Sequence, residues 1–274
     1  MANVRERSLD TNTFSSDIYA EEQPDDGTVD PSEVPLLLFL VPGIRTDKLW
    51  AHHLRGATKV WPQRKIEVKI AGSDRISSAH LIFRVGLQAF RSEIKNQVID
   101  TSQKFPDHKI SFICHSMGSS LFSEIVSEVH ASPDPTKEGS TIGSRIENIL
   151  FLGSICKRSK SREMSMSCAT FVNDVGTKDI LPWVASTVNP FKYNDVGRFG
   201  FGNSYTTDRF FKNNHKSCTS EEHLTEHALP FLSGGYMSEP VPPRTSIHLT
   251  RYTYLRRVIW ASPIVYFLVS HLLF

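Results

Sequence analysis

Short apolar runs, separated by polar stretches rich in turn-forming residues, recur along the chain from residue 36 onward. Runs of this length are typical of buried strands. One stretch, residues 65–71, instead alternates apolar and charged positions, which also indicates a strand. The pattern predicts six strands, at residues 36–41, 65–71, 110–114, 146–152, 169–172 and 210–211.

Between these runs, apolar residues recur with a helical period. The clearest case is residues 78–103, where the spacing stays close to 3.6 at Leu81, Val85, Phe90, Ile94 and Val98. Further helices are expected near residue 49, over 117–129 and over 221–232, the last kinked at Pro230. Strands alternating with helices, and strands that are mostly continuous apolar runs, predict an α/β fold. Its sheet should be mostly parallel, with helices on both faces and no large lid domain.

Composition and charge divide the chain into a core and two flanking parts. The chain has 274 residues, 39% of them hydrophobic, and a net charge of +2, which argues against a dedicated nucleic-acid binder. Residues 1–34 hold nine acidic side chains and two arginines, a net charge of −7, so the remainder carries +9. We interpret this stretch as an acidic flexible arm that is not a signal peptide, and we expect reduced cysteines in an intracellular protein.

A candidate nucleophile follows the strand at 110–114. The segment Cys114-His115-Ser116-Met117-Gly118 carries a serine between a predicted strand and a predicted helix. A serine at such a turn has its hydroxyl exposed above the sheet edge, provided that the residues two before and two after it are small. Cys114 and Gly118 meet that requirement. His115 is expected to point away from the serine.

On these residues, positions 35–235 resemble the α/β-hydrolase superfamily, whose nucleophile turn is usually written G-x-S-x-G; Cys114 stands where the first glycine is usual. The resemblance implies the α/β-hydrolase fold and a serine hydrolase that needs neither a cofactor nor a metal. It also implies an oxyanion hole. The backbone N–H groups of Met117 and of Ile44, in the turn Pro42-Gly43-Ile44 after the first strand, fit that role.

The order of residues in the family is serine, acid, histidine. Two acids follow the 169–172 strand, and we rank Asp179, further into the loop, above Asp174, which sits almost on the strand. His215 lies between the last predicted strand and the closing helix, where the family places its base. The resemblance therefore assigns the triad to Ser116, Asp179 and His215, with Asp174 as second choice for the acid.

A rival motif lies in the closing helix. His223-Leu224-Thr225-Glu226-His227 matches the H-x-x-E-H signature of some zinc peptidases. Such a site needs a third protein ligand, and Glu239 is the only acid left downstream. We interpret the motif as the polar face of an amphipathic helix and expect no metal.

The end of the chain carries a second apolar feature. After a proline-containing linker at 236–257, residues 258–274 contain no Lys, Arg, Asp or Glu. This length is marginal for a membrane span. We expect a membrane anchor, with an interfacial helix or a helix packed on the domain as alternatives. Arg251, Arg256 and Arg257 precede the run and favour a hydrolase domain that faces the cytoplasm.

Together these features predict a serine hydrolase that cleaves an acyl ester, with a lipid or other acyl ester as the first choice of substrate, through an acyl-enzyme. Two alternatives stay open at this point. One is a catalytically silent hydrolase fold that acts as a membrane-tethered binding module. The other is a thioesterase or peptidase of the same fold.

Overall fold

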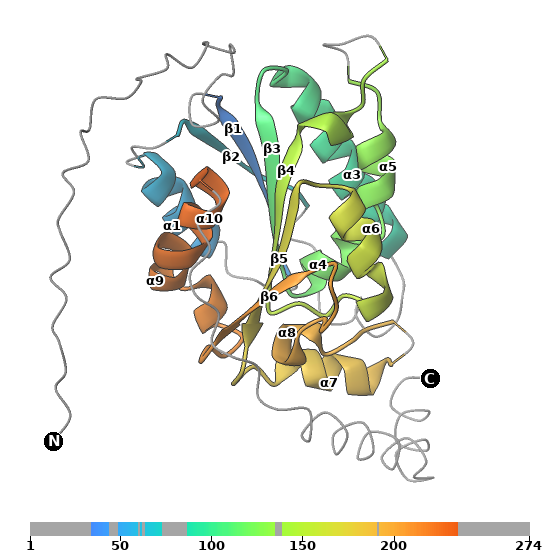
Figure 1. The fold of residues 1–274 in the computed structure, drawn as a ribbon, viewed down its shortest axis with the longest axis vertical. Coiled ribbons are helices and arrows are strands. Elements are labelled where there is room, and N and C mark those ends of the chain that lie inside the picture. The colour runs from blue at the N-terminus through green and yellow to red at the C-terminus, as the bar shows by residue number, and fades with distance from the viewer. Residues whose placement is uncertain are drawn as a thin grey trace, which may run out of the picture.

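A six-stranded sheet runs through the middle of the molecule (Figure 1). The computed structural model describes residues 34–43, 49–59, 61, 64–72, 87–134, 139–190 and 192–234, so the expected arm, the linker and the apolar run at 258–274 lie outside the described residues. The strand order is β2-β1-β3-β4-β5-β6, and every neighbouring pair is parallel. The strands are β1 (Leu36–Val41), β2 (Ile66–Ile70), β3 (Lys109–His115), β4 (Ile146–Leu152), β5 (Thr170–Gly176) and β6 (Thr207–Phe211).

Helices cover both faces of this sheet, which confirms the expected fold class. In Figure 1, α1 (Leu49–Lys59), α9 (Glu221–His223) and α10 (Leu229–Gly234) lie on one side, and α3 (Leu87–Lys104), α5 (Val126–Ala131) and α6 (Ser161–Met166) lie on the other. All six residues of β1 are buried, and successive side chains enter opposite cores. A strand buried on both faces has to be apolar at every position, which explains the unbroken run in the sequence.

Two expected helices differ in detail. The helix expected at 78–103 is α3, which begins at Leu87, and residues 73–86 lie outside the described ones. The helix expected over 117–129 is split into α4 (Met117–Phe122) and α5. Ser123 lies in the break, and its hydroxyl donates to the carbonyl of Ser120 at 2.9 Å. Such a local side-chain bond competes with helical backbone bonding.

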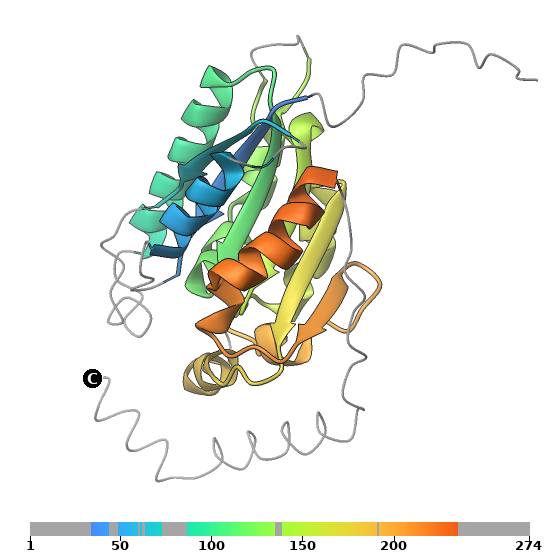
Figure 2. The same ribbon diagram turned by 90° about the vertical axis from the view of Figure 1, so that its left-hand side faces the viewer.

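The closing helix contains a widened turn just before Pro230, where a kink was expected. It consists of α9, a π-helical segment η4 (Leu224–Ala228) and α10. Pro230 lacks an N–H and its ring crowds the carbonyl four residues earlier, so a π turn just before it relieves the conflict. Figure 2 shows this helix beside α1, on the same face of the sheet.

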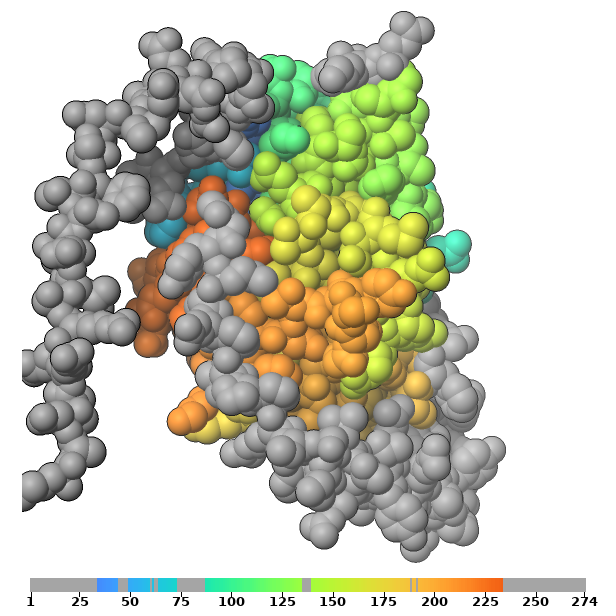
Figure 3. Space-filling view, viewed as in Figure 1, coloured from blue at the N-terminus to red at the C-terminus, as the bar shows by residue number. Residues whose placement is uncertain are grey.

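Short helices, rather than an inserted lid, follow β4 and β5. They are η2 (Arg158–Lys160) with α6 after β4, and α7 (Leu181–Val188) with α8 (Val196–Phe199) after β5. Two further short turns are η1 (Ile142–Arg145) and η3 (Ser217–Thr219). In Figure 3 the residues between β4 and β6 form one continuous surface without a separate lobe. The described part of the chain thus has no large lid domain, as expected.

Helix α7 was not predicted from the sequence. Pro182 lies in its first turn, where a proline is tolerated because that N–H has no helical partner. No helix of the described residues is long and apolar enough to cross a membrane.

Candidate active site

The backbone at Ser116 is strained. Ser116 connects β3 to α4 with φ 53° and ψ −120°, and no other described non-glycine residue has a positive φ. A side chain in this sparsely populated region costs on the order of 1–3 kcal/mol and persists only where the surrounding structure imposes it. Here the N–H of Ser116 donates to the Leu152 carbonyl at 3.0 Å, and the Ser119 hydroxyl donates to the Ser116 carbonyl at 2.6 Å.

The turn is tight because the end of β1 packs directly on it. A Cβ placed on Gly118 would lie 2.1 Å from the Val41 carbonyl oxygen and 2.7 Å from that of Pro42, so only glycine fits. The Pro42-Gly43 turn therefore lies against the start of α4, beside Met117. This is the arrangement that the expected oxyanion hole requires, although Ile44 itself lies outside the described residues.

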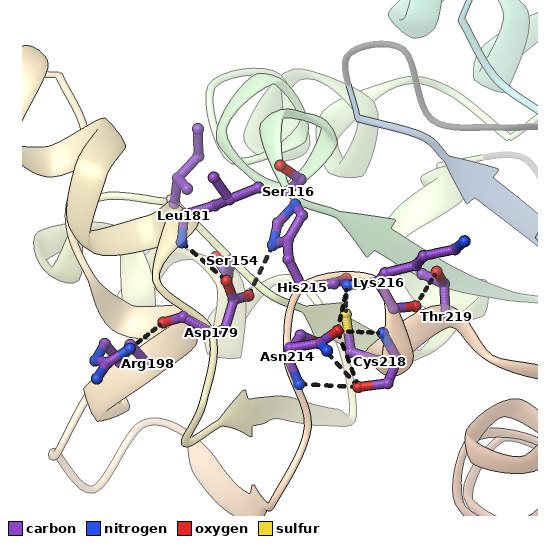
Figure 4. A network of polar contacts seen from close by, with 12 residues as sticks. Ser116, Ser154, Asp179, Leu181, Arg198, Asn214, His215, Lys216, Cys218 and Thr219 are labelled. Carbon is purple, nitrogen blue, oxygen red and sulfur yellow. Dashed lines mark hydrogen bonds and ion pairs between the residues drawn. The ribbon is translucent and has the colours of Figure 1, made fainter.

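An aspartate and a histidine are joined at the ends of the next two strands. Nδ1 of His215, after β6, lies 2.7 Å from Oδ2 of Asp179, after β5 (Figure 4). The Asp179 side chain is fully buried, whereas that of His215 is 18% exposed. The other carboxylate oxygen accepts the N–H of Leu181 at 3.0 Å, and the Asp179 carbonyl accepts from Arg198 at 2.8 Å.

The two loops that carry this pair are bound to each other. The N–H of Thr177 donates to the Phe211 carbonyl at 2.9 Å, and that of Lys178 donates to the Asn213 carbonyl at 3.0 Å. A glycine leaves room for the pair: Gly153 has φ 53°, and a Cβ there would lie 3.0 Å from both Asp179 Oδ2 and His215 Nδ1.

The structure pairs the predicted acid with the predicted base, and the residue before the predicted serine packs against that base. Figure 4 shows Ser116 beside the imidazole of His215, and the ring of His115, the residue before Ser116, lies 4.7 Å from that imidazole, centroid to centroid. No hydrogen bond joins Ser116 and His215 in the described structure. Bonds of this kind are often long without substrate and tighten when it binds.

His115 has an unexpected position. Its ring lies between Trp50 and His215, is 4% exposed, and has no hydrogen-bond partner for either nitrogen in the described part of the chain. Burial, reinforced by the neighbouring His215, lowers the pKa of His115 from 6.5 to about 3. His115 is thus a neutral ring packed against the candidate base.

This burial makes a pH dependence of stability predictable. Between about pH 6.5 and 3 the unfolded chain protonates His115 and the folded chain does not, so the free energy of unfolding should fall as the pH falls through this range. One such group contributes up to about 1.4 kcal/mol per pH unit. Urea unfolding at pH 7 and pH 5 should therefore show a smaller loss of stability at pH 5 for His115→Phe than for the wild type. His52→Phe, at an exposed position of α1, is the control, and an equal loss in wild type and His115→Phe would contradict the prediction.

Asp174, the second choice for the acid, is engaged elsewhere. It lies within β5 at 1% exposure, directly opposite Arg209 of β6. Arg209 donates to its two oxygens at 2.6 and 2.8 Å, and Nε2 of His223 lies 2.9 Å from Oδ2. The structure gives Asp174 no contact with His215, and Arg209, which nothing in the sequence analysis singled out, fully occupies its carboxylate.

The H-x-x-E-H motif takes part in the same buried cluster. Nδ1 of His223 accepts from the side-chain amide of Asn213 at 3.1 Å, and Nε2 donates to Asp174. The His227 ring lies 5.1 Å from that of His223, and burial, followed by the neighbouring His223 and Arg209, lowers the pKa of His227. Both ring nitrogens of His223 are thus bound by protein groups. The described residues contain no cluster of three or more side chains able to hold a metal ion.

Comparisons with known proteins give structural neighbours only. No family model matches the chain, and no curated protein matches it. A search of solved structures found the esterase domain of a Rhodothermus marinus protein, at 8% identity and a TM-score of 0.42, covering 84% of this chain and 89% of that one. It also found an acetyl xylan esterase (11% identity, TM-score 0.36, covering 69% and 93%) and RedJ (13% identity, TM-score 0.34, covering 89% and 96%). Because all three TM-scores are below 0.5, the function is argued from the geometry of this chain.

Proposed function

We propose that the protein is a serine hydrolase that cleaves an acyl ester through an acyl-enzyme. One observation carries the proposal: a strained serine at the end of β3 lies beside a buried Asp–His pair held at the ends of β5 and β6. Strain of this kind has to be imposed by the surrounding structure, and a serine next to an oriented imidazole is the arrangement that nucleophilic catalysis needs.

The reaction follows from these positions. The imidazole of His215 takes the proton of the Ser116 hydroxyl while Oγ attacks the ester carbonyl, forming a tetrahedral oxyanion. The backbone N–H of Met117, together with an N–H from the turn that contains Ile44, would hold this oxyanion. His215 then gives its proton to the departing alcohol. A water repeats the sequence on the acyl-enzyme, releasing the acid and restoring Ser116.

Asp179 orients the base. Its Oδ2 lies 2.7 Å from Nδ1 of His215, which fixes the tautomer that carries a proton on Nδ1 and leaves Nε2 free to face Ser116. The carboxylate is shielded from water, and its second oxygen is held by the Leu181 N–H. It therefore stabilises the imidazolium without needing to rearrange.

A fluorophosphonate probe tests this proposal directly. We expect it to label the wild type at Ser116 and to spare Ser116→Ala, because only an activated serine attacks the probe. Ser144→Ala, at an exposed position, is the matched control and should label normally. Absence of labelling in the wild type would favour a catalytically silent binding module.

We also propose that residues 258–274 tether the protein to a membrane with the hydrolase domain on the cytoplasmic side. The support is the 17-residue run without Lys, Arg, Asp or Glu after Arg251, Arg256 and Arg257. Deleting residues from Tyr252 onward should move the protein to the soluble fraction and leave hydrolysis of a soluble short-chain ester unchanged. Every described element ends before this position. Full-length protein released by a carbonate wash, or a truncated protein that unfolds, would contradict the tether.

A further inference from the structure

Three aliphatic side chains stand exposed on the first turns of α7, directly after Asp179. Ile180 is 59%, Leu181 47% and Val184 38% exposed. Val184 lies three residues after Leu181 and four after Ile180, and positions three and four residues apart share a helical face. Only three other large apolar residues of the described structure are exposed, and they are scattered at Leu49, Met166 and Tyr205.

This apolar group is fixed beside the candidate active site. The N–H of Leu181 donates to Asp179 Oδ1 at 3.0 Å, so the start of α7 is anchored to the same carboxylate that holds His215. Figure 4 shows the Leu181 side chain directed to the same side of the site as Ser116. A surface that covers these side chains therefore lies close to the Asp179–His215 pair.

Three lysines lie in the two loops that carry the Asp179–His215 pair. These are Lys178, Lys212 and Lys216, and all three are exposed. In the described structure none of them forms an ion pair, unlike Lys69, Lys95 and Lys160. The acid between them, Asp179, is buried and bound to His215. The nearest exposed carboxylates along the chain, Glu221 and Glu222, belong to α9, which packs toward α1.

We propose that this surface docks on an anionic lipid membrane; we call it the mouth surface, and its residues are Lys178, Ile180, Leu181, Val184, Lys212 and Lys216. Aliphatic side chains that enter the headgroup region, flanked by lysines that attract anionic lipids, are the two components of interfacial binding. A protein partner fits less well, because lysine is depleted at protein–protein interfaces.

The docking proposal extends the proposed function and rests on it, because docking serves catalysis only if Ser116 cleaves an ester. Docking by the mouth surface presents Ser116 to an ester that lies in the bilayer. The tether proposed for residues 258–274 would only keep the enzyme near the membrane, whereas the mouth surface sets its orientation. Docking itself needs no catalysis, so it can be measured separately.

A fluorophore at Val184 gives a local readout in the full-length chain. Val184→Cys is labelled with the environment-sensitive dye NBD, and the unsubstituted protein treated in the same way gives the background, because three of its four cysteines are buried. Tyr205→Cys is the control: it is 45% exposed and precedes β6, at the opposite end of that strand from His215. Vesicles of phosphatidylcholine alone are compared with vesicles containing one-fifth phosphatidylserine.

We expect NBD at position 184 to brighten severalfold and shift to shorter wavelength on the anionic vesicles, with little change on the neutral ones. NBD at position 205 should not respond. Replacing Lys178, Lys212 and Lys216 by Glu should weaken the response at 184 at least about tenfold in apparent affinity, and added salt should do the same.

Two results would overturn the proposal. One is a silent label at 184 on protein that sediments with the vesicles, which would assign membrane contact to another part of the chain. The other is an equal response to neutral vesicles that survives the three Lys→Glu changes. The fluorophosphonate probe, applied to the same samples, reports on Ser116 independently, so failure of the proposed function and failure of docking give different patterns.

Discussion

His215→Ala should lower kcat for a short-chain acyl ester by about 10⁴- to 10⁶-fold and leave the fold intact. In the proposed mechanism this imidazole takes the proton of Ser116. Its side chain lies in a loop after β6 and is partly exposed, so its removal creates no buried cavity. Steady-state kinetics and urea unfolding of the same preparation measure both halves of the prediction.

The double variant Ser116→Ala/His215→Ala provides a stricter test. Residues of a triad act as a unit, so the double variant should be little slower than either single one. His52→Ala, at an exposed position of α1, is the control and should keep normal turnover. Near-normal turnover in His215→Ala would mean that another group is the base.

Substitution of Asp179 should mainly lower activity, whereas substitution of Asp174 should mainly lower stability. Asp179→Asn should lower kcat about 10⁴-fold, because an amide donor facing Nδ1 of His215 selects the wrong tautomer. Its stability should change little. Asp174→Asn should instead lower the free energy of unfolding by about 3–5 kcal/mol, since it leaves the guanidinium of Arg209 buried without its charge partner.

Urea unfolding and kinetics on both variants separate these effects. The double variant Asp174→Asn/Arg209→Met should be more stable than Asp174→Asn, because it leaves no unpaired charge in the core. A stable but inactive Asp174→Asn, together with an active Asp179→Asn, would move the role of the acid to Asp174.

The apolar pattern predicted the central strands well because helices cover both faces of the sheet. All six buried residues of β1 are apolar, and the expected boundaries of β1, β3 and β4 lie within one residue of the observed ones or match them. β5 was harder, since Asn173 and Asp174 interrupt its apolar run, yet the strand continues to Gly176. The Asn173 side-chain N–H groups donate to the Val196 carbonyl and to Asp208, and Asp174 pairs with Arg209, and a local pattern does not reveal these partners.

Part of the candidate site could also be predicted from the sequence. Serine, acid and base each follow a strand of one parallel sheet, so their order along the chain places them at one edge. What the sequence could not reveal were the long-range partners. Arg209 meets Asp174 only through the register of β5 and β6, and His115 meets His215 only because two strand ends converge.

The placement of these groups along the chain also has a consequence for synthesis. A nascent chain that ends before β6 holds Ser116 and Asp179 but neither His215 nor Arg209. Such a fragment lacks the proposed base, and Asp174 has no charge partner that would let β5 close into a dry core. The same strand therefore completes both the core and the reactive site. Unfinished chains should remain inert toward cellular esters until β6 leaves the ribosome and joins the sheet.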